Sequence, residues 1–271
     1  MKRLLSIVSA AFLTLSAAFG EDSSLSAIRE RGFLKVAVFA DAPPFSYKDA
    51  NGEYQGYEIM LAKRLAKELF DDEQKVEFIA VESSARIEAL EEGAVDIVLA
   101  NFTVKHERKA RVDFANPYAK ASIGILSGSE YITKPAQLIG KNLIVKRGTT
   151  AEAYFSIAYP EIKLIRVNTN KEGFDALQGE KASAFAHDNT ILLAWALQNR
   201  GFRVGVAAIG SAEPIAPAVK KGDAELVRWI NEMLFKLGRE KFAMKAFYAT
   251  MLPFYGGSIQ PEDFIVEGGM F

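Results

Sequence analysis

The chain has 271 residues, 49% of them hydrophobic, which is enough for one large domain or two modest ones with a substantial core. The 33 basic and 34 acidic residues give a formal net charge of −1, which offers no basis for binding nucleic acid or an anionic membrane surface. With no cysteine and only two histidines, disulfides, thiolate metal sites and a cysteine nucleophile are excluded, and we expect no metal and no cofactor.

Residues 1–20 have the pattern of an export signal. Lys2 and Arg3 give a basic start, an apolar run extends to Ala18, and a small residue, Gly20, ends a cleavage motif. The apolar run is too short for a membrane span, and it contains no cysteine that could be acylated. We therefore expect a signal peptide cleaved near Gly20 and a soluble mature protein in the periplasm.

Short apolar strands then alternate with amphipathic helices. The spacing predicts strands over 33–39, 76–81 and 95–100, and helices over 58–70 and 84–92. Repeated strand–helix–strand units imply a mainly parallel sheet flanked by helices.

A second series of the same kind follows. It contains predicted strands over 142–146, 162–167, 182–186 and 204–209, alternating with predicted helices over 150–158, 171–178 and 189–199. Extended runs over 121–127 and 214–219 flank this series, and helices over 224–236 and 240–251 complete the chain.

Two extended runs around a compact middle predict that the chain crosses twice between two α/β lobes. The first lobe would comprise 21–122 and 216–271, and the second, inserted lobe 123–215. The hinge strands would lie at 121–127 and 213–219.

Ligands of open parallel sheets bind beyond the carboxyl ends of the strands, so residues that follow strands are site candidates. The candidates are Asp41, Phe45, Tyr57, Arg86, Asn101, Phe102, Thr103, Arg108, Gly148, Thr149, Thr150 and Asp188. Ser83 and His187 also follow strands, and we interpret His187 as a structural histidine.

This set suits an amino-acid zwitterion. Arg108 can bind a carboxylate through two donors, and Thr103 can donate its hydroxyl to the same group. The segment 148–150 starts a helix, whose free N–H groups also favour a carboxylate. Asp188 can pair with an ammonium. Each residue alone has an ordinary structural explanation, such as a helix cap or a solvated charge, so the prediction depends on their joint placement.

Several motifs in order along the chain carry a family likeness: Asp41-Ala42-Pro43-Pro44-Phe45, Asn101-Phe102-Thr103, Val112-Asp113-Phe114, Lys146-Arg147-Gly148-Thr149-Thr150 and Ala216-Pro217-Ala218-Val219. They resemble the polar amino-acid solute-binding proteins of ABC transporters, the family-3 periplasmic binding proteins. The resemblance implies a type II two-lobe fold, an amino-acid ligand, an ABC permease as partner, a monomer and no enzymatic activity.

The resemblance also implies roles for single residues. Arg108 and Thr103 would hold the α-carboxylate, with Thr149 and Thr150 closing on it from the other lobe. Asp188 would bind the α-ammonium, helped by the carbonyl of Asn101. Phe45 and Tyr57 would line the region of the ligand side chain. Arg86 matches a position that contacts the side-chain carboxylate of the ligand in some binders of acidic amino acids.

Within that family, the stretches His187-Asp188-Asn189-Thr190 and Val266-Glu267-Gly268-Gly269 resemble the cysteine-binding members of Campylobacter-type bacteria. L-Cysteine is therefore the expected ligand. Arg86 leaves glutamate or aspartate open, and another small polar amino acid is a further alternative. Two alternatives of other classes are an exported enzyme like cyclohexadienyl dehydratase, built on the same scaffold, and the sensor domain of a receptor.

Overall fold

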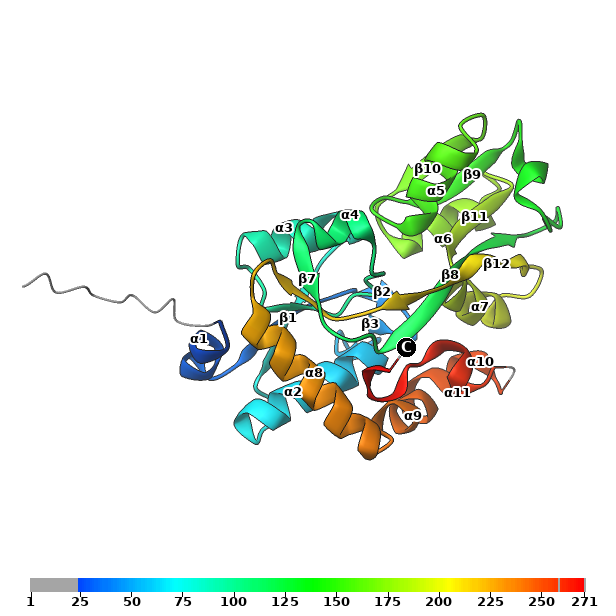
Figure 1. The fold of residues 1–271 in the computed structure, drawn as a ribbon. Helices are drawn as coiled ribbons and strands as arrows, with labels where there is room; N and C mark the ends of the chain where they lie inside the picture. The colour runs from blue at the N-terminus through cyan, green and yellow to red at the C-terminus, as the bar shows by residue number, and fades with distance from the viewer. Residues whose placement is uncertain (1–23, 258, 271) are drawn as a thin grey trace, which may run out of the picture.

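A computed structural model describes residues 24–257 and 259–270, so the predicted signal peptide lies outside the described residues. The described chain forms two lobes, each built on a five-stranded sheet (Figure 1). This arrangement confirms the predicted α/β fold class, with mixed sheets flanked by helices.

The sheet of the first lobe has the order β5-β1-β6-β13-β7. Its strands are β5 (Val76–Ala80), β1 (Leu34–Val38), β6 (Ile97–Val98), β13 (Ala218–Lys220) and β7 (Val112–Phe114). The first three are parallel, and β13 is antiparallel to both of its neighbours. A small antiparallel sheet adjoins it, made of β2 (Asp41–Ala42), β3 (Ser46–Lys48) and β4 (Tyr54–Gln55).

Helices cover this sheet because each carries an apolar stripe. In α2 (Tyr57–Phe70), for example, Ala62, Leu65 and Ala66 recur at helical spacing and are buried. The other helices of the first lobe are α1 (Ser24–Arg31), α3 (Arg86–Glu91), α4 (His106–Lys109), α8 (Ala224–Arg239), α9 (Phe242–Ala246), α10 (Leu252–Tyr255) and α11 (Pro261–Phe264). The predicted helix over 240–251 contains a π-helical segment, Phe247–Met251, between α9 and α10.

The sheet of the second lobe has the order β10-β9-β11-β8-β12. Its strands are β10 (Lys163–Val167), β9 (Asn142–Lys146), β11 (Ala184–Asp188), β8 (Ala119–Ser127) and β12 (Arg203–Ile215). Strands β10, β9 and β11 are parallel, and β8 is antiparallel to both of its neighbours, β11 and β12. Three helices pack on this sheet: α5 (Thr150–Ala158), α6 (Asn170–Gln178) and α7 (Asn189–Gln198).

The structure differs from the prediction at β12, which is one strand of 13 residues rather than two extended runs. Gly210, at φ 73°, and Pro214 favour a break, but β12 is an edge strand. An edge strand tolerates proline and absorbs extra residues as bulges, and the β12 register shifts three times against β8. The two strands therefore remain paired from the second lobe down to Ala119 and Ile215.

A two-stranded neck joins the lobes. Strand β11 pairs with β8 only as far as Ile123, so Ala119–Ala121 and Glu213–Ile215 pair with each other below that point. Isolated bridges from Ile215 to Thr103 and from Ala119 to Ile265 attach the neck to the first lobe. Figure 1 shows β8 and β12 running side by side between the lobes.

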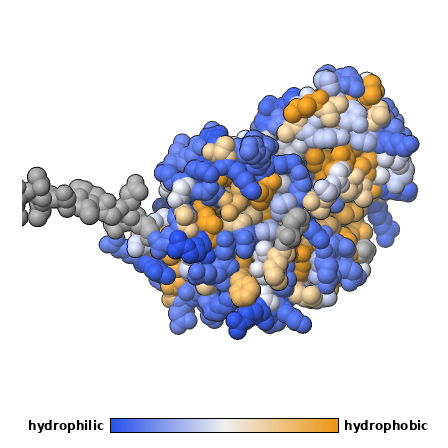
Figure 2. Space-filling view, in the orientation of Figure 1, coloured by the Kyte–Doolittle hydropathy of each residue, from blue (hydrophilic) through white to orange (hydrophobic). Residues whose placement is uncertain are grey.

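The face shown in Figure 2 carries many hydrophilic residues, with hydrophobic residues in separate groups on both lobes. Within the described residues, no helix is long and apolar enough to cross a membrane.

Candidate functional site

A small cavity lies between the two lobes. Its walls are unusually polar for a buried site. The first lobe contributes Phe39, Ser83, Arg86, Asn101, Thr103 and Arg108, and the second contributes Thr149, Thr150, His187 and Asp188.

The structure brings seven of the twelve predicted site residues to the walls of this cavity: Arg86, Asn101, Thr103, Arg108, Thr149, Thr150 and Asp188. Phe102 and Gly148 lie directly behind the walls, where they contact Arg108. The other three predicted residues are not among the lining residues. Phe45 and Tyr57 belong to the buried core of the first lobe, and Asp41 makes contacts between the lobes.

Arg108 is held by the backbone around the cavity. Its guanidinium donates to the Thr103 carbonyl at 2.8 Å and to the Gly148 carbonyl of the other lobe at 3.0 Å. It also lies 4.8 Å from the ring centroid of Phe102, within range of a cation–π contact. Because a guanidinium has five N–H donors, Arg108 keeps further donors for a carboxylate in the cavity.

The N-terminus of α5 faces the same cavity. Thr149 caps this helix by accepting a hydrogen bond from the Glu152 N–H at 3.2 Å, and Thr150 is its first residue. The first N–H groups of a helix have no partner within the helix, and they carry the positive end of its dipole. The second lobe therefore contributes a second anion-binding element opposite Arg108.

Asp188 provides the negative charge of the site. It ends β11 and stands at the N-cap position of α7, but its side chain makes no capping hydrogen bond with that helix. Its carboxylate instead accepts a hydrogen bond from Asn101 Nδ2, across the two lobes, at 2.6 Å. Burial raises the pKa of Asp188 to about 6, although Arg86 and Arg108 act in the opposite direction. A buried carboxylate of this kind is suited to binding a cation.

Asn101 is positioned by a buried carboxylate from α2. Its backbone has φ 48°, a left-handed conformation that asparagine tolerates better than most residues. Its N–H donates to Glu58 at 2.6 Å, and Glu58 also accepts from Ser46 and Tyr118, each at 2.5 Å. Burial raises the pKa of Glu58 to about 7. Glu58 thus fixes the end of β6 without lining the cavity.

Arg86 is committed to the protein backbone. Its guanidinium donates to the carbonyls of Ser83, Ala100, Asn101 and Gly148 at 2.9, 2.9, 3.2 and 2.9 Å. Most of its donors are therefore used, which favours a role in holding the strand ends and the two lobes together.

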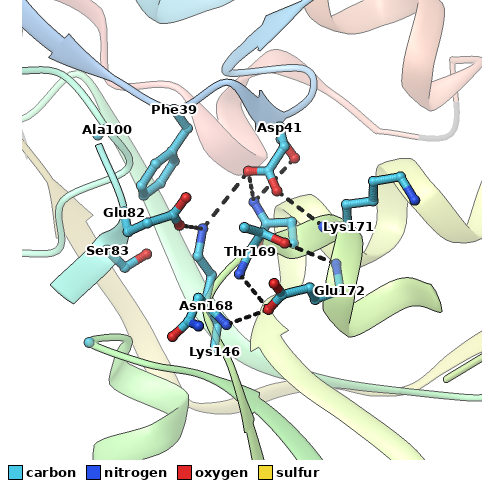
Figure 3. Close-up of polar contacts among 12 residues, drawn as sticks. Phe39, Asp41, Glu82, Ser83, Ala100, Lys146, Asn168, Thr169, Lys171 and Glu172 are labelled. Carbon is cyan, nitrogen blue, oxygen red and sulfur yellow. Dashed lines mark hydrogen bonds and ion pairs between the residues drawn. The ribbon is translucent and has the colours of Figure 1, made fainter. Parts of the chain in front are cut away.

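Polar contacts between the lobes continue beside the cavity (Figure 3). Asp41 accepts hydrogen bonds from Asn170 Nδ2 and from the Lys171 N–H, each at 3.1 Å, at the start of α6. The Lys146 side chain reaches between Glu82 and Asp41, with its Nζ 3.6 Å and 3.9 Å from their carboxylate oxygens. These contacts, with those of Gly148, bring the lobes together in a closed arrangement.

Three lining residues are absent from the site predicted by sequence: Phe39, Ser83 and His187. Ser83 and His187 do follow strands or end them, so the strand-end rule could have included them. His187 is the second-last residue of β11 and is 2% exposed. His187 is absent from the predicted site because a lone histidine is interpreted as structural, although the next residue, Asp188, is included.

Comparison with known proteins agrees with this geometry. The family model for bacterial extracellular solute-binding proteins, family 3, matches residues 34–246. The chain belongs to this family. A glutamine-binding protein of an ABC transporter from Bacillus subtilis is 31% identical over 217 residues, which is 79% of each chain.

Two solved structures are more similar. A cysteine-binding protein from Campylobacter jejuni is 43% identical, with a TM-score of 0.89 and coverage of 90% of this chain and 99% of that one. A solute receptor for L-cysteine from Neisseria gonorrhoeae is 44% identical, with a TM-score of 0.87 and the same coverage. These relatives are binding proteins and not enzymes, so the expectations of a solute-binding protein of ABC transport and of no enzymatic activity are confirmed.

The raised pKa of Asp188 gives a test that needs no ligand. Because the folded-state pKa of about 6 exceeds the ordinary value of 3.8, the contribution of Asp188 to the free energy of unfolding falls as pH rises from 4 to 6. This difference in pKa corresponds to roughly 3 kcal/mol. Asp188→Asn cannot titrate, so its free energy of unfolding relative to the wild type should increase by up to that amount between pH 4 and pH 7.

Urea denaturation at the two pH values measures this difference. Asp175→Asn, at an exposed position of α6, is the matched control and should show little change. An Asp188→Asn effect of equal size at pH 4 and pH 7 would rule out a raised pKa.

Proposed function

We propose that this protein binds a small L-amino acid, with L-cysteine preferred, by closing its lobes around it, and delivers it to the permease of an ABC importer. The observation that supports this most directly is the pairing of opposite charges across one cavity. Arg108, Thr103 and the N-terminus of α5 line the same cavity as the carboxylate of Asp188. An α-carboxylate and an α-ammonium match these groups.

The similarity to two L-cysteine-binding structures favours cysteine as the ligand. An acidic ligand would need a free cation for its side-chain carboxylate, but Arg86 already donates to four backbone carbonyls. Cysteine therefore fits better than glutamate or aspartate.

Closure is proposed to depend on Gly148. Its carbonyl accepts hydrogen bonds from Arg86 and Arg108 of the first lobe. A Cβ atom at this position would lie 2.6 Å from the Ser84 backbone nitrogen, so the two backbones meet where only glycine fits. Opening would bend the neck, with the hinge strands at 121–127 and 213–219 and the second lobe spanning 123–215.

The remaining parts of the proposal concern the setting of the protein. The family is extracellular, and the basic start and apolar run of residues 1–20 support export to the periplasm with cleavage near Gly20. We propose that the protein acts as a soluble monomer, which meets the permease with both lobes closed on the ligand and has no role in binding nucleic acid.

A thermal-shift screen of the L-amino acids, with cysteine kept reduced, tests the proposed function. A ligand that binds only the folded state raises the melting temperature in proportion to ln(1 + [L]/Kd). Reduced L-cysteine should give the largest shift. An unchanged melting temperature with every amino acid would contradict the proposal.

Removing Arg108 should leave the ligand carboxylate buried without its main partner. Arg108→Ala is expected to weaken binding of L-cysteine by about 2–5 kcal/mol, as measured by isothermal titration calorimetry. Arg111→Ala is the control, because Arg111 is exposed and pairs only with Glu91 among the described residues. Equal affinities of the two variants would show that Arg108 does not hold the carboxylate.

Gly148→Ala should interfere with closure. The added methyl group would push against the Ser84 backbone, so cysteine affinity should fall roughly tenfold or more. Gly140→Ala is the matched control: its φ of 78° is close to the 74° of Gly148, but nothing lies within 4 Å of its Cβ position. Both variants carry the backbone strain, and only the first blocks closure. Similar calorimetric affinities of the two variants would argue against Gly148 as the closing contact.

A further inference from the structure

Three of the described residues that line the cavity have a buried polar atom without a hydrogen-bond partner, and one of these atoms, Asn101 Oδ1, belongs to the amide that already holds Asp188. Ser83 Oγ and His187 Nε2 have no hydrogen-bond partner anywhere in the described part of the chain. Ser83 is 5% exposed and His187 is 2% exposed, and the two residues come from opposite lobes. Because an unpaired buried polar atom is costly, such atoms at a binding site point to a partner in the ligand.

The hydrogen-bonding state of His187 follows from its neighbour. Its Nδ1 accepts a hydrogen bond from the Asp188 N–H at 2.6 Å, so Nδ1 carries no proton. Burial, together with the charges of Lys146 and Arg86, lowers the pKa of His187 to about 3, which keeps the imidazole neutral near pH 7. The single ring proton then lies on Nε2, and His187 offers one donor to the cavity.

Ser83 complements this donor. Its hydroxyl can both donate and accept, whereas His187 Nε2 can only donate. Phe39 provides an apolar wall of the same cavity. These three residues line the same cavity, and together they offer the contacts that suit one polarizable heteroatom beside an aromatic ring.

We propose that Ser83 and His187 form the subsite that selects the ligand side chain, and that they select a single sulfur or oxygen atom bonded to the β-carbon. This inference rests on the proposed function and assigns the specificity of the same site. A thiol suits the subsite best, because sulfur can accept from His187, contact Phe39 favourably and enter an apolar recess at low cost. A serine hydroxyl can make the same polar contacts, but its removal from water costs more.

The surroundings also indicate which side chains are disfavoured. Alanine lacks the heteroatom, so it would leave both buried atoms unpaired. Lysine and arginine would bring donors to a subsite that already provides a donor.

Calorimetry with L-cysteine, L-serine and L-alanine tests the subsite, because these ligands differ only in the atom on the β-carbon. The wild type should bind cysteine at least about tenfold more tightly than alanine. Ser83→Ala and His187→Phe should each weaken cysteine binding by about threefold to tenfold or more, and should leave alanine binding nearly unchanged.

His187→Gln provides the rescue, since the glutamine amide returns an N–H near the position of His187 Nε2, and it should restore much of the cysteine preference. His106→Phe, which changes the other histidine at an exposed position of α4, should match the wild type.

The outcomes separate the two proposals. Equal losses for cysteine and alanine in both variants, or no loss for either ligand, would overturn the subsite while leaving the amino-acid-binding function intact. Failure of the wild type to bind any of the three amino acids, or tighter binding of L-glutamine than of cysteine, would overturn the preference for a short side chain and with it the subsite. The subsite is supported if Ser83→Ala and His187→Phe lose affinity for cysteine but not for alanine, and if His187→Gln restores the preference for cysteine.

Discussion

The two lobes meet at the Gly148 carbonyl, which accepts hydrogen bonds from two buried guanidinium groups, Arg86 and Arg108. Both cations belong to the first lobe, and their mutual repulsion contributes to lowering the pKa of Arg86, after burial itself. Asp188 is the acidic residue among the described residues that line the cavity, and its carboxylate interacts with the positive charges of Arg86 and Arg108. A ligand carboxylate would add negative charge beside these cations, and further contacts with Thr149, Thr150 and Asp188 of the second lobe would make the ligand favour closure.

Two buried carboxyl groups at or beside the site lower the folding stability of the protein near neutral pH. Asp188 and Glu58 are buried carboxyl groups whose pKa values are raised to about 6 and about 7. Near neutral pH, each therefore costs folding free energy that an ordinary surface carboxylate would not. Asp188 is available to an ammonium, and Glu58 holds Asn101, which in turn holds Asp188 across the lobes. This chain of contacts links α2 of the first lobe to the ligand-facing end of β11.

Much of this arrangement can be predicted from the sequence. The alternation of strands and helices, with two extended runs, predicts two α/β lobes, and the strand-end rule alone places Arg108, Thr103 and Asp188 in one site. The rule works because parallel strands bring residues that are far apart in sequence to one sheet edge. It does not decide which of the residues beyond a strand turn inward, and so it includes Asp41, Phe45 and Tyr57.

Other features depend on contacts that periodicity does not encode. The four carbonyl partners of Arg86 come from both lobes, so no local sequence pattern predicts them. A lone histidine is usually structural, so the sequence favours that interpretation for His187, whose neutral, donor-bearing state follows only from the Asp188 N–H that faces Nδ1. The continuous β12 escapes prediction because glycine and proline break central strands but not bulged edge strands.

A crystal structure of the protein with L-cysteine is the most direct test of the account, and the ligand sulfur offers a clear marker. The chain contains no cysteine, so an anomalous sulfur peak in the cavity cannot come from a cysteine of the protein, and no methionine is among the described residues that line the cavity. The account predicts that peak between Ser83, His187 and Phe39, with the α-carboxylate at Arg108 and the α-ammonium at Asp188. A sulfur peak elsewhere, or a ligand bound with its carboxylate away from Arg108, would contradict it.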